Sequence, residues 1–339
     1  MNKKQNVLIT GSSGTVGLEV LKQLYNKSEN FNLTVFDIKI PKTEKIYSKY
    51  KDKIEVVYGD ISNFEDVKKI STDKDFVIHL AALIPPAADE HPELAYKINT
   101  QGTENLVRNL EVFSPNCFFL YSSSISVYGD RVKTPDITVN DKLQASEGDE
   151  YAISKIEAEK IIINSKLNWS IFRLAAIMGN HKISKLMFHM PLDTSLEIAT
   201  PHDTALAFVN AIEKADLISK KIFNLGGGEN YRISYADFLN RSFEISGLGK
   251  ADFPKFAFAS KNFHCGYYQD GEILEKILHF RNGTIDDYFN NMAKQTNKLI
   301  YFLTSIFRRS IKNNLLKKSE PYLAYKNKDT KLMNRFFNN

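Results

Sequence analysis

Apolar and polar positions alternate between strand-like and helix-like patterns through the first half of the chain. Short, continuous apolar runs, typical of strands buried on both faces, occupy residues 6–10, 33–37, 54–58, 76–81, 118–122 and 169–174. Between them, apolar residues recur with helical spacing at 15–26, 64–70, 93–112 and 151–164. Because parallel strands need a crossover connection, usually a helix, this alternation predicts an α/β protein with a doubly wound parallel sheet.

The second half is less regular and predicts a smaller lobe. Helical spacing recurs at residues 204–214, 235–246, 271–278 and 284–294, and a short strand at 223–225 ends in three glycines. No internal repeat or low-complexity linker separates the two halves. We therefore expect residues 1–180 to form the sheet domain and residues 181–293 a smaller α/β lobe that binds substrate and is partly interleaved with the sheet. Residues 294–339 are expected to form a basic helical extension.

The net charge of the chain is concentrated in this extension. The whole chain has 45 Lys and Arg residues against 40 Asp and Glu, a net charge of +5. From Lys294 onward there are eleven basic residues and only two acidic ones, Glu320 and Asp329, so the preceding part is net negative. That part gives no reason to expect nucleic-acid binding.

Composition also bears on compartment and metal content. The two cysteines, Cys117 and Cys265, do not suggest a disulfide framework, and this favours a reducing, cytoplasmic compartment. No run of eighteen apolar residues predicts a membrane span, and no signal peptide is evident. No metal is expected, because no metal-ligand spacing relates the histidines, which include His79, His181, His189, His202 and His264.

A glycine-rich turn, residues 10–17, joins the first predicted strand to the first predicted helix. Glycines permit a tight turn and close approach of the backbone to a pyrophosphate, and free N–H groups at the helix start attract the anion. Asp37 ends the second strand, where a carboxylate accepts hydrogen bonds from the ribose hydroxyls of NAD and repels the 2′-phosphate of NADP. The pattern predicts a dinucleotide site that prefers NAD. Lys39 lies nearby and leaves NADP as an alternative cofactor. The alternative interpretation of Asp37 is that it is only a turn residue at the end of the strand.

Tyr151 and Lys155 lie four residues apart, on one face of a predicted helix. The same spacing occurs at two other tyrosines, but only Tyr151 follows the fifth strand of the predicted sheet. That strand ends in serines 122–124, and ligands of doubly wound sheets bind beyond the carboxyl ends of the strands. We therefore expect Ser124, Tyr151 and Lys155 to converge on one substrate. A polar turn is the alternative for the serines.

Taken in order, these motifs resemble the extended short-chain dehydrogenase/reductases of the NAD-dependent epimerase/dehydratase family, which have a Rossmann domain. The similarity covers about residues 5–180 and is specific for the family but weak for the substrate. Besides the glycine turn and Asp37, it rests on Gly59-Asp60-Ile61, His79-Leu80-Ala81-Ala82, Asn99-x-x-Gly102-Thr103-x-Asn105-Leu106, Ser122 to Gly129, Tyr151-x-x-x-Lys155 and Arg173-Leu174. Weaker similarity continues through His202-Asp203, Asn224-Leu225-Gly226 and residues 284–288.

The resemblance implies a role for each of these residues. Tyr151 would be the general acid/base, Lys155 would hydrogen-bond the nicotinamide ribose, and Ser124 would orient the substrate hydroxyl. A free tyrosine has a pKa of about 10, and both the Lys155 ammonium and oxidised nicotinamide would favour its phenolate. Asn99 would orient Lys155 or a water, or only hold helix to strand. The other implied cofactor contacts are Gly11, Ser13, Gly14, Thr15, Val16, Gly17, Asp37, Asp60, Ile61, Leu80, Ala81 and Ala82.

Three departures from the family pattern bear on the substrate. Ile125-Ser126 stands where sugar-nucleotide dehydratases have an Asp-Glu pair, which disfavours dehydration. Ala176 stands where many sugar epimerases have an asparagine that contacts the nucleotide diphosphate, and the segment between Arg173 and His202 is short. A smaller substrate, or a nucleotide held differently, is therefore expected. The candidate phosphate contacts are Arg232 and Arg281, for which a solvated surface position is the alternative.

The leading hypothesis is an NAD-dependent enzyme that acts on a hydroxyl of a sugar or sugar nucleotide. Epimerisation and net oxidation or reduction both use Ser124, Tyr151 and Lys155, so the sequence does not separate them. A second hypothesis is a membrane-surface oxidoreductase of a lipid-like alcohol. A non-catalytic NAD-sensing regulator is disfavoured, because a sensor does not need a proton-transfer pair.

The extension combines an apolar run at residues 299–307 with the basic residues that follow it. It is too short and too charged to span a bilayer. A helix with apolar and basic faces can lie peripherally in a membrane interface. The interpretation we favour is instead a helix that docks on the body, or on the partner in a homodimer, and presents its lysines to water.

Overall fold

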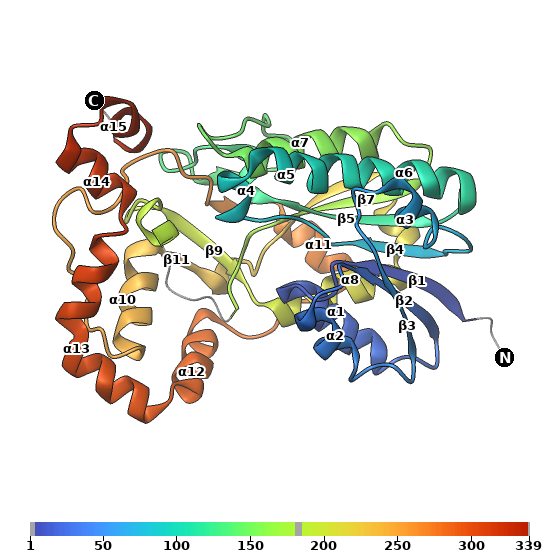
Figure 1. Cartoon of the computed structure of the whole chain (residues 1–339), viewed down its shortest axis with the longest axis horizontal. Helices are drawn as coiled ribbons and strands as arrows, with labels where there is room; N and C mark the ends of the chain where they lie inside the picture. The colour runs from blue at the N-terminus through green and yellow to red at the C-terminus, as the bar shows by residue number, and fades with distance from the viewer. Residues whose placement is uncertain (1–3, 180–184, 338–339) are drawn as a thin grey trace.

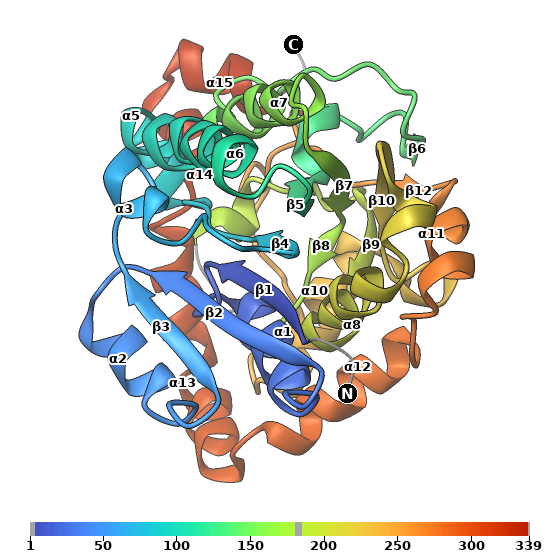
Figure 2. The same cartoon turned by 90° about the vertical axis from the view of Figure 1, so that its right-hand side faces the viewer.

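A central sheet of seven parallel strands organises the chain in the computed structural model, which describes residues 4–179 and 185–337. The strands lie in the order β10-β7-β5-β4-β1-β2-β3 (Figure 1, with β10 labelled in Figure 2). The chain builds β1, β2 and β3 outward in one direction, then returns to place β4 on the other side of β1. The strand order therefore reverses between β1 and β4, which is where ligands of such sheets bind. The strand bounds are β1 Gln5–Thr10, β2 Phe31–Asp37, β3 Ile54–Tyr58, β4 Phe76–His79, β5 Phe118–Ser124, β7 Asn168–Leu174 and β10 Lys221–Leu225.

Helices cover both faces of this sheet (Figure 2). One face packs against α1 (Thr15–Tyr25), α8 (Pro201–Glu213) and α11 (Gly271–Leu278) in one apolar cluster. The other packs against α3 (Phe64–Lys68), α6 (Gly102–Phe113) and α7 (Glu150–Ile163) in a second. Because both faces are covered, the strands are buried as the continuous apolar runs indicated, and the predicted doubly wound fold is confirmed.

The expected elements differ from the structure in a few places. The helix expected at residues 93–112 comprises α5 (Pro92–Ala95), a π-helical segment at Tyr96–Gln101 and α6. Two short helices, α2 (Pro41–Tyr47) and α4 (Ala87–Glu90), were not expected. The strand expected in the second half, β10, pairs with β7 and so extends the main sheet. This pairing connects distant parts of the chain, so local periodicity could not place the strand.

The smaller lobe has its own sheet and core. Strands β8 (Ala176–Ile177), β9 (Ser195–Ala199) and β11 (Arg232–Ser234) form a three-stranded sheet. It packs with α10 (Tyr235–Ile245) and α12 (Ile285–Gln295) around a separate apolar cluster. A two-stranded sheet, β6 (Asp136–Ile137) with β12 (Tyr267–Tyr268), and the helix α9 (Ala215–Ile218) complete the region. Since α8, β10 and α11 belong to the main sheet and its cover, the two regions are interleaved along the chain.

The C-terminal extension forms three helices, α13 (Lys298–Leu316), α14 (Glu320–Asn327) and α15 (Thr330–Phe336), along the outer side of the lobe (Figure 1). Its second part is docked: the Ser319 hydroxyl donates to the carbonyl of Ala257 at 2.7 Å, and Phe336 and Phe337 pack on Ala259. The favoured interpretation, that the extension docks on the body of the protein, therefore holds for the part from Ser319 to Phe337. Among the helices that the structure describes, none is long and apolar enough to cross a membrane.

Candidate active site

The glycine turn lies against the loop that follows β4, at the point where the strand order reverses. Gly11 has a φ of +71°, and a Cβ built there would lie 2.6 Å from the backbone of Ala81. A Cβ at Gly17 would lie 2.3 Å from the carbonyl oxygen of Gly11. Both positions therefore admit only glycine. Gly14 precedes α1, which begins without a side-chain cap, and both Gly14 and Thr15 are exposed. The start of α1 is thus open to an anion.

Asp37, at the end of β2, is tied directly to this turn. One carboxylate oxygen accepts from the Ser13 amide at 3.1 Å and from the Tyr47 hydroxyl at 2.7 Å. The Tyr47 hydroxyl also pairs with Ser12 Oγ at 2.8 Å. Burial raises the pKa of Tyr47, and the charge of Asp37 raises it further. Sequence reasoning missed Tyr47, because it lies on the unexpected helix α2.

The residues expected around the adenine and along the cofactor groove follow β3 and β4. Asp60 is exposed, and its carboxylate accepts from the amide and hydroxyl of Ser62. Ile61 is buried and packs against Gly102, whose Cβ would lie 2.8 Å from it. The half-buried residues of the β4 loop are Leu80, Ala81 and Ala82, and Val16 is half-buried in the first turn of α1.

Asn99 holds the loop after β4 to α7. Its side-chain amide donates to the Leu83 carbonyl and to Ser154 Oγ, both at 2.9 Å, and its oxygen accepts from the Leu83 amide at 2.7 Å. Asn99 is fully buried within the π-helical segment. The resemblance implied that Asn99 either orients Lys155 or a water, or only holds helix to strand. These contacts are of the second, structural kind.

Ser124, Tyr151 and Lys155 are brought together at the carboxyl end of β5. Lys155 Nζ donates to the Ser122 carbonyl at 2.8 Å and lies 5.7 Å from the centre of the Tyr151 ring. Ser124 and Tyr151 line the same cavity, and Ser124 Oγ accepts from the Ser126 amide at 3.2 Å. Burial lowers the pKa of Lys155 to about 7, against the opposing charge of Glu159.

The effect of Lys155 and nicotinamide on the pKa of Tyr151 stays a prediction. Burial raises the pKa of Tyr151 above its ordinary value, and the neighbouring Ser124 hydroxyl only opposes this. The lysine is itself desolvated, and its ammonium is directed to the Ser122 carbonyl. Tyr151 therefore holds its proton at neutral pH.

A buried ion pair supports the helix that carries Tyr151 and Lys155. Glu159 lies one turn beyond Lys155 and accepts from Arg173 Nη2 at 2.7 Å and Nε at 3.0 Å. It also accepts from the Ser123 hydroxyl at 2.5 Å. The pair joins α7 to β5 and β7. Sequence reasoning missed Glu159, although its position four residues after Lys155 on the same helical face was a usable signal.

A cavity of about 1580 Å³ opens between the sheet domain and the lobe, with Ser124 and Tyr151 in its wall. Much of its lining is apolar and comes from the lobe: Met178, Met187, Met190, Phe238, Leu239, Phe243, Tyr288 and Met292. A polar group also lines it, made of Asp89, Asp149, His189, His264 and, from α15 of the extension, Arg335. Burial and the neighbouring Asp149 raise the pKa of Asp89 to about 6.

Neither arginine proposed as a phosphate contact lines this cavity. Arg232 pairs with the fully buried Glu197 at 3.0 Å and donates to the Tyr268 carbonyl. Arg281 donates to the Gly226 carbonyl and pairs with Glu272. The expected solvated surface position is therefore wrong, and the expected phosphate contact receives no support from the cavity lining. Both guanidinium groups are partly buried and are held by ion pairs within the protein.

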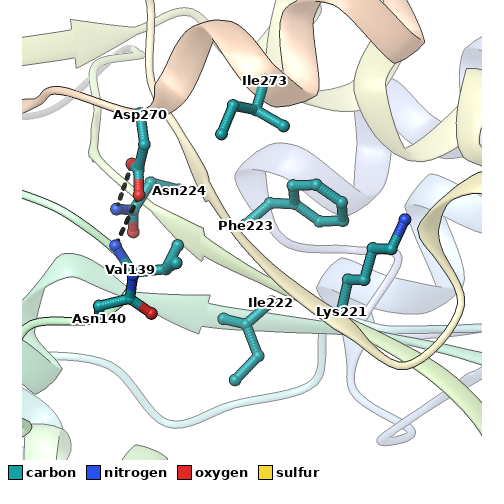
Figure 3. Close-up of a pocket in the computed structure, with 8 residues that line it drawn as sticks. All are labelled: Val139, Asn140, Lys221, Ile222, Phe223, Asn224, Asp270 and Ile273. Atoms are coloured by element: carbon teal, nitrogen blue, oxygen red, sulfur yellow. Dashed lines mark hydrogen bonds between the residues drawn. The ribbon is translucent and has the colours of Figure 1, made fainter.

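A smaller cavity of about 330 Å³ lies beside β10 and shares no residue with the predicted site (Figure 3). Asp270 there accepts from the Val139 amide at 2.6 Å and from Asn224 at 2.8 Å (Figure 3). These bonds tie the loop before α7 to the edge of the sheet, which is a structural role.

The histidines do not form a metal site in the described part of the chain. His79 is buried between the hydroxyls of Thr10 and Thr103, at 2.6 and 3.0 Å, and burial lowers its pKa to about 3. His181 lies outside the described residues. Within residues 4–179 and 185–337, no group of three His, Cys, Asp or Glu side chains is placed to hold a metal ion.

Comparison with known proteins shows which families the chain resembles. Residues 8–174 match the 3-beta hydroxysteroid dehydrogenase/isomerase family. A UDP-glucose 4-epimerase of Pisum sativum is 31% identical over 198 residues, which are 54% of this chain and 55% of that one. A decarboxylating sterol-4-alpha-carboxylate 3-dehydrogenase of Candida albicans is 33% identical over 187 residues, or 52% and 51%. The chain thus spans about half the length of these relatives.

The fold itself is shared over most of the chain. The structure of a UDP-glucuronic acid 4-epimerase from Bacillus cereus, in complex with UDP-glucuronic acid and NAD, superposes with a TM-score of 0.71 at 19% identity. The match covers 86% of this chain and 99% of that one. It includes the smaller lobe as well as the sheet domain.

Proposed function

We propose that the chain is an extended short-chain dehydrogenase/reductase, and that it is an NAD-dependent oxidoreductase or epimerase acting on a secondary alcohol, with Tyr151 as the acid/base. One observation carries the proposal: Ser124 and Tyr151 line the cavity between the sheet domain and the lobe, and Lys155 Nζ lies 5.7 Å from the centre of the Tyr151 ring. A protein that only senses a dinucleotide would not need this proton-transfer group.

The residues around the turn fit NAD. Gly11 and Gly17 leave no room for a Cβ, so the backbone can approach a pyrophosphate, and the uncapped start of α1 offers N–H groups to it. Asp37 is half-buried at the end of β2, where it would accept from the adenosine ribose. When bound, NAD would supply the hydride acceptor and a positive charge near Tyr151.

The proton chemistry is assigned to Tyr151. At neutral pH Tyr151 is a neutral phenol, so it carries the proton that a carbonyl oxygen needs in the reductive direction. Oxidation of an alcohol needs the phenolate as base, so that direction is favoured as the pH rises. Ser124, which lines the cavity with Tyr151, would hold the reacting oxygen, and Lys155 would donate to the ribose of the bound cofactor.

Two substrate classes follow from different observations. A hydroxyl of a sugar or sugar nucleotide is the first, because the relatives of this chain include UDP-glucose 4-epimerases. A lipid-like alcohol is the second, because the methionines and aromatic residues of the cavity wall offer apolar contact and the two candidate phosphate-binding arginines are committed elsewhere.

Native mass spectrometry of the purified full-length protein, with NAD reduction assays, tests these proposals. The assays use UDP-sugars in one arm and apolar secondary alcohols in detergent in the other, and epimerised UDP-sugars are sought by chromatography. Turnover in one arm identifies the class. Tight NAD binding without turnover of either class would contradict the catalytic proposal and favour a cofactor-sensing role.

A further inference from the structure

The first half of α13 presents an uncovered apolar face. Five large apolar side chains share this outward face, with exposed fractions of 66% for Leu299, 58% for Phe302, 45% for Leu303, and 57% for both Ile306 and Phe307. Their spacing of three and four residues places them in one stripe along the helix. A contiguous apolar stripe of this kind on a surface marks an interaction site.

The opposite side of α13 contacts the lobe at several points, although none of its residues is fully buried. The backbone at Tyr301 lies against Gly247, where a Cβ would be 2.6 Å from the Tyr301 carbonyl. Further along, Ile311 and Leu315 pack into the lobe core, and Lys312 pairs with Asp252. Asn297 caps the helix start by accepting from the Leu299 amide at 2.8 Å. The attachment fixes which face points outward.

The charge around the stripe has one sign. From Lys294 to Lys318 the chain has seven Lys or Arg residues and no Asp or Glu. Lys298 lies at the start of the stripe and Arg309 just beyond its end, and both are exposed. An apolar stripe bordered by cations is complementary to a bilayer surface that carries anionic headgroups.

We propose that the outward face of α13 docks on an anionic lipid surface, with the apolar stripe inserted at the headgroup level and the basic residues among the phosphates. A second copy of this chain fits less well, because a symmetric contact would bring two such basic segments together. The helix lies in the interface rather than crossing it, since it is not apolar enough to span.

The docked face lies next to the large cavity. Gln295, which is exposed, and Thr296 both line that cavity, and α13 begins two residues later, at Lys298. Docking would therefore bring this edge of the cavity close to the lipid surface. The docking itself does not depend on the reaction proposed above.

Vesicle flotation with the full-length protein tests the proposal. Vesicles of phosphatidylcholine with phosphatidylserine should carry the protein upward, and vesicles of phosphatidylcholine alone should not. Raising the salt concentration should weaken the binding, because exposed charges are screened over about 8 Å at physiological ionic strength. The double variant Phe302→Asp/Ile306→Asp should lower the bound fraction at least about tenfold, because it removes apolar contacts and adds negative charge.

The matched control is Leu217→Asp/Ile273→Asp, which changes two exposed apolar residues, 53% and 56% exposed, on helices away from α13. It should bind anionic vesicles like the unmodified protein. Melting curves and NAD titrations of both variants should match the unmodified protein, which separates docking from folding and from the proposed function.

Other outcomes overturn the proposal. Equal flotation with the two vesicle types would reject the anionic surface. No flotation with either type would reject a lipid surface. A dimer, detected by light scattering and dispersed by Phe302→Asp/Ile306→Asp, would assign the stripe to a second copy of the chain instead.

Discussion

Replacing Glu159 with Gln should strongly destabilise the protein, although Glu159 is not one of the residues that line the large cavity. Glu159 and Arg173 are 1% and 3% exposed, and the carboxylate receives three hydrogen bonds, two from the guanidinium and one from Ser123. The glutamine keeps one acceptor oxygen but turns a donor NH₂ toward the arginine, which remains charged and buried. Breaking a buried pair by removing one partner costs about 3–5 kcal/mol.

Urea unfolding measures this loss as a lower midpoint with an unchanged slope. The control is Glu157→Gln on the same helix. Glu157 pairs with Lys160 at 2.6 Å, but the two side chains are 43% and 61% exposed, so the loss should stay below about 1 kcal/mol. The double variant Glu159→Gln/Arg173→Met should regain much of the stability, because it no longer buries an unpaired charge.

The same substitution should alter the active site through Lys155. The Glu159 carboxylate raises the pKa of Lys155 against burial, so its loss should move that pKa below about 7. A loss of stability below about 1 kcal/mol in Glu159→Gln, equal to that of the control, would refute the reasoning that this pair holds α7 to the sheet.

Three further substitutions test the cofactor site and the lysine. Asp37→Ala should weaken NAD binding and reduce the preference for NAD over NADP, because it removes the charge that opposes a 2′-phosphate. Calorimetric titration with both cofactors measures this preference, and an unchanged preference would contradict the prediction. Gly11→Ala should cost about 2–4 kcal/mol in urea unfolding and abolish NAD binding, since its Cβ meets the Ala81 backbone. Gly249→Ala, also at positive φ but with its Cβ only in ordinary contact with Arg308 at 3.8 Å, should cost only about 1 kcal/mol, and equal losses would contradict the clash. Lys155 has a pKa of about 7 in the fold and about 10.4 when unfolded, so the unfolded chain binds more protons between these values and stability should rise with pH in that window. Lys155→Met should remove that part of the rise, and an identical pH dependence in both proteins would contradict the shifted pKa.

The parts of the fold that follow local rules were predictable from the sequence. Buried parallel strands read as continuous apolar runs, and their order with the helices identified the sheet. The π-helical segment before α6 was not predictable, because Asn99 and Thr100 adopt it while bonding to Ser154 on another helix. Partners distant in sequence leave no local signal.

The same limit explains which residues of the site could be predicted from the sequence and which could not. The glycine turn and the Tyr151–Lys155 spacing are local motifs, so they were found. The roles of Arg232 and Arg281 depend on Glu197 and Glu272, which periodicity cannot pair with them. Arg335 shows the limit most clearly, because only docking of the extension brings this residue, far along the chain from Tyr151, into the wall of the same cavity.

The most direct test of the central claim is single-turnover kinetics of Tyr151→Phe with saturating NAD and a substrate identified by the assays above. The variant should bind NAD as the unmodified protein does and react at least about a hundredfold more slowly, the usual contribution of a positioned acid/base. Tyr288→Phe, which removes another hydroxyl from the cavity wall, should react within a few-fold of the unmodified protein. A Tyr151→Phe enzyme that keeps nearly full turnover would contradict the account, because another group would then move the proton.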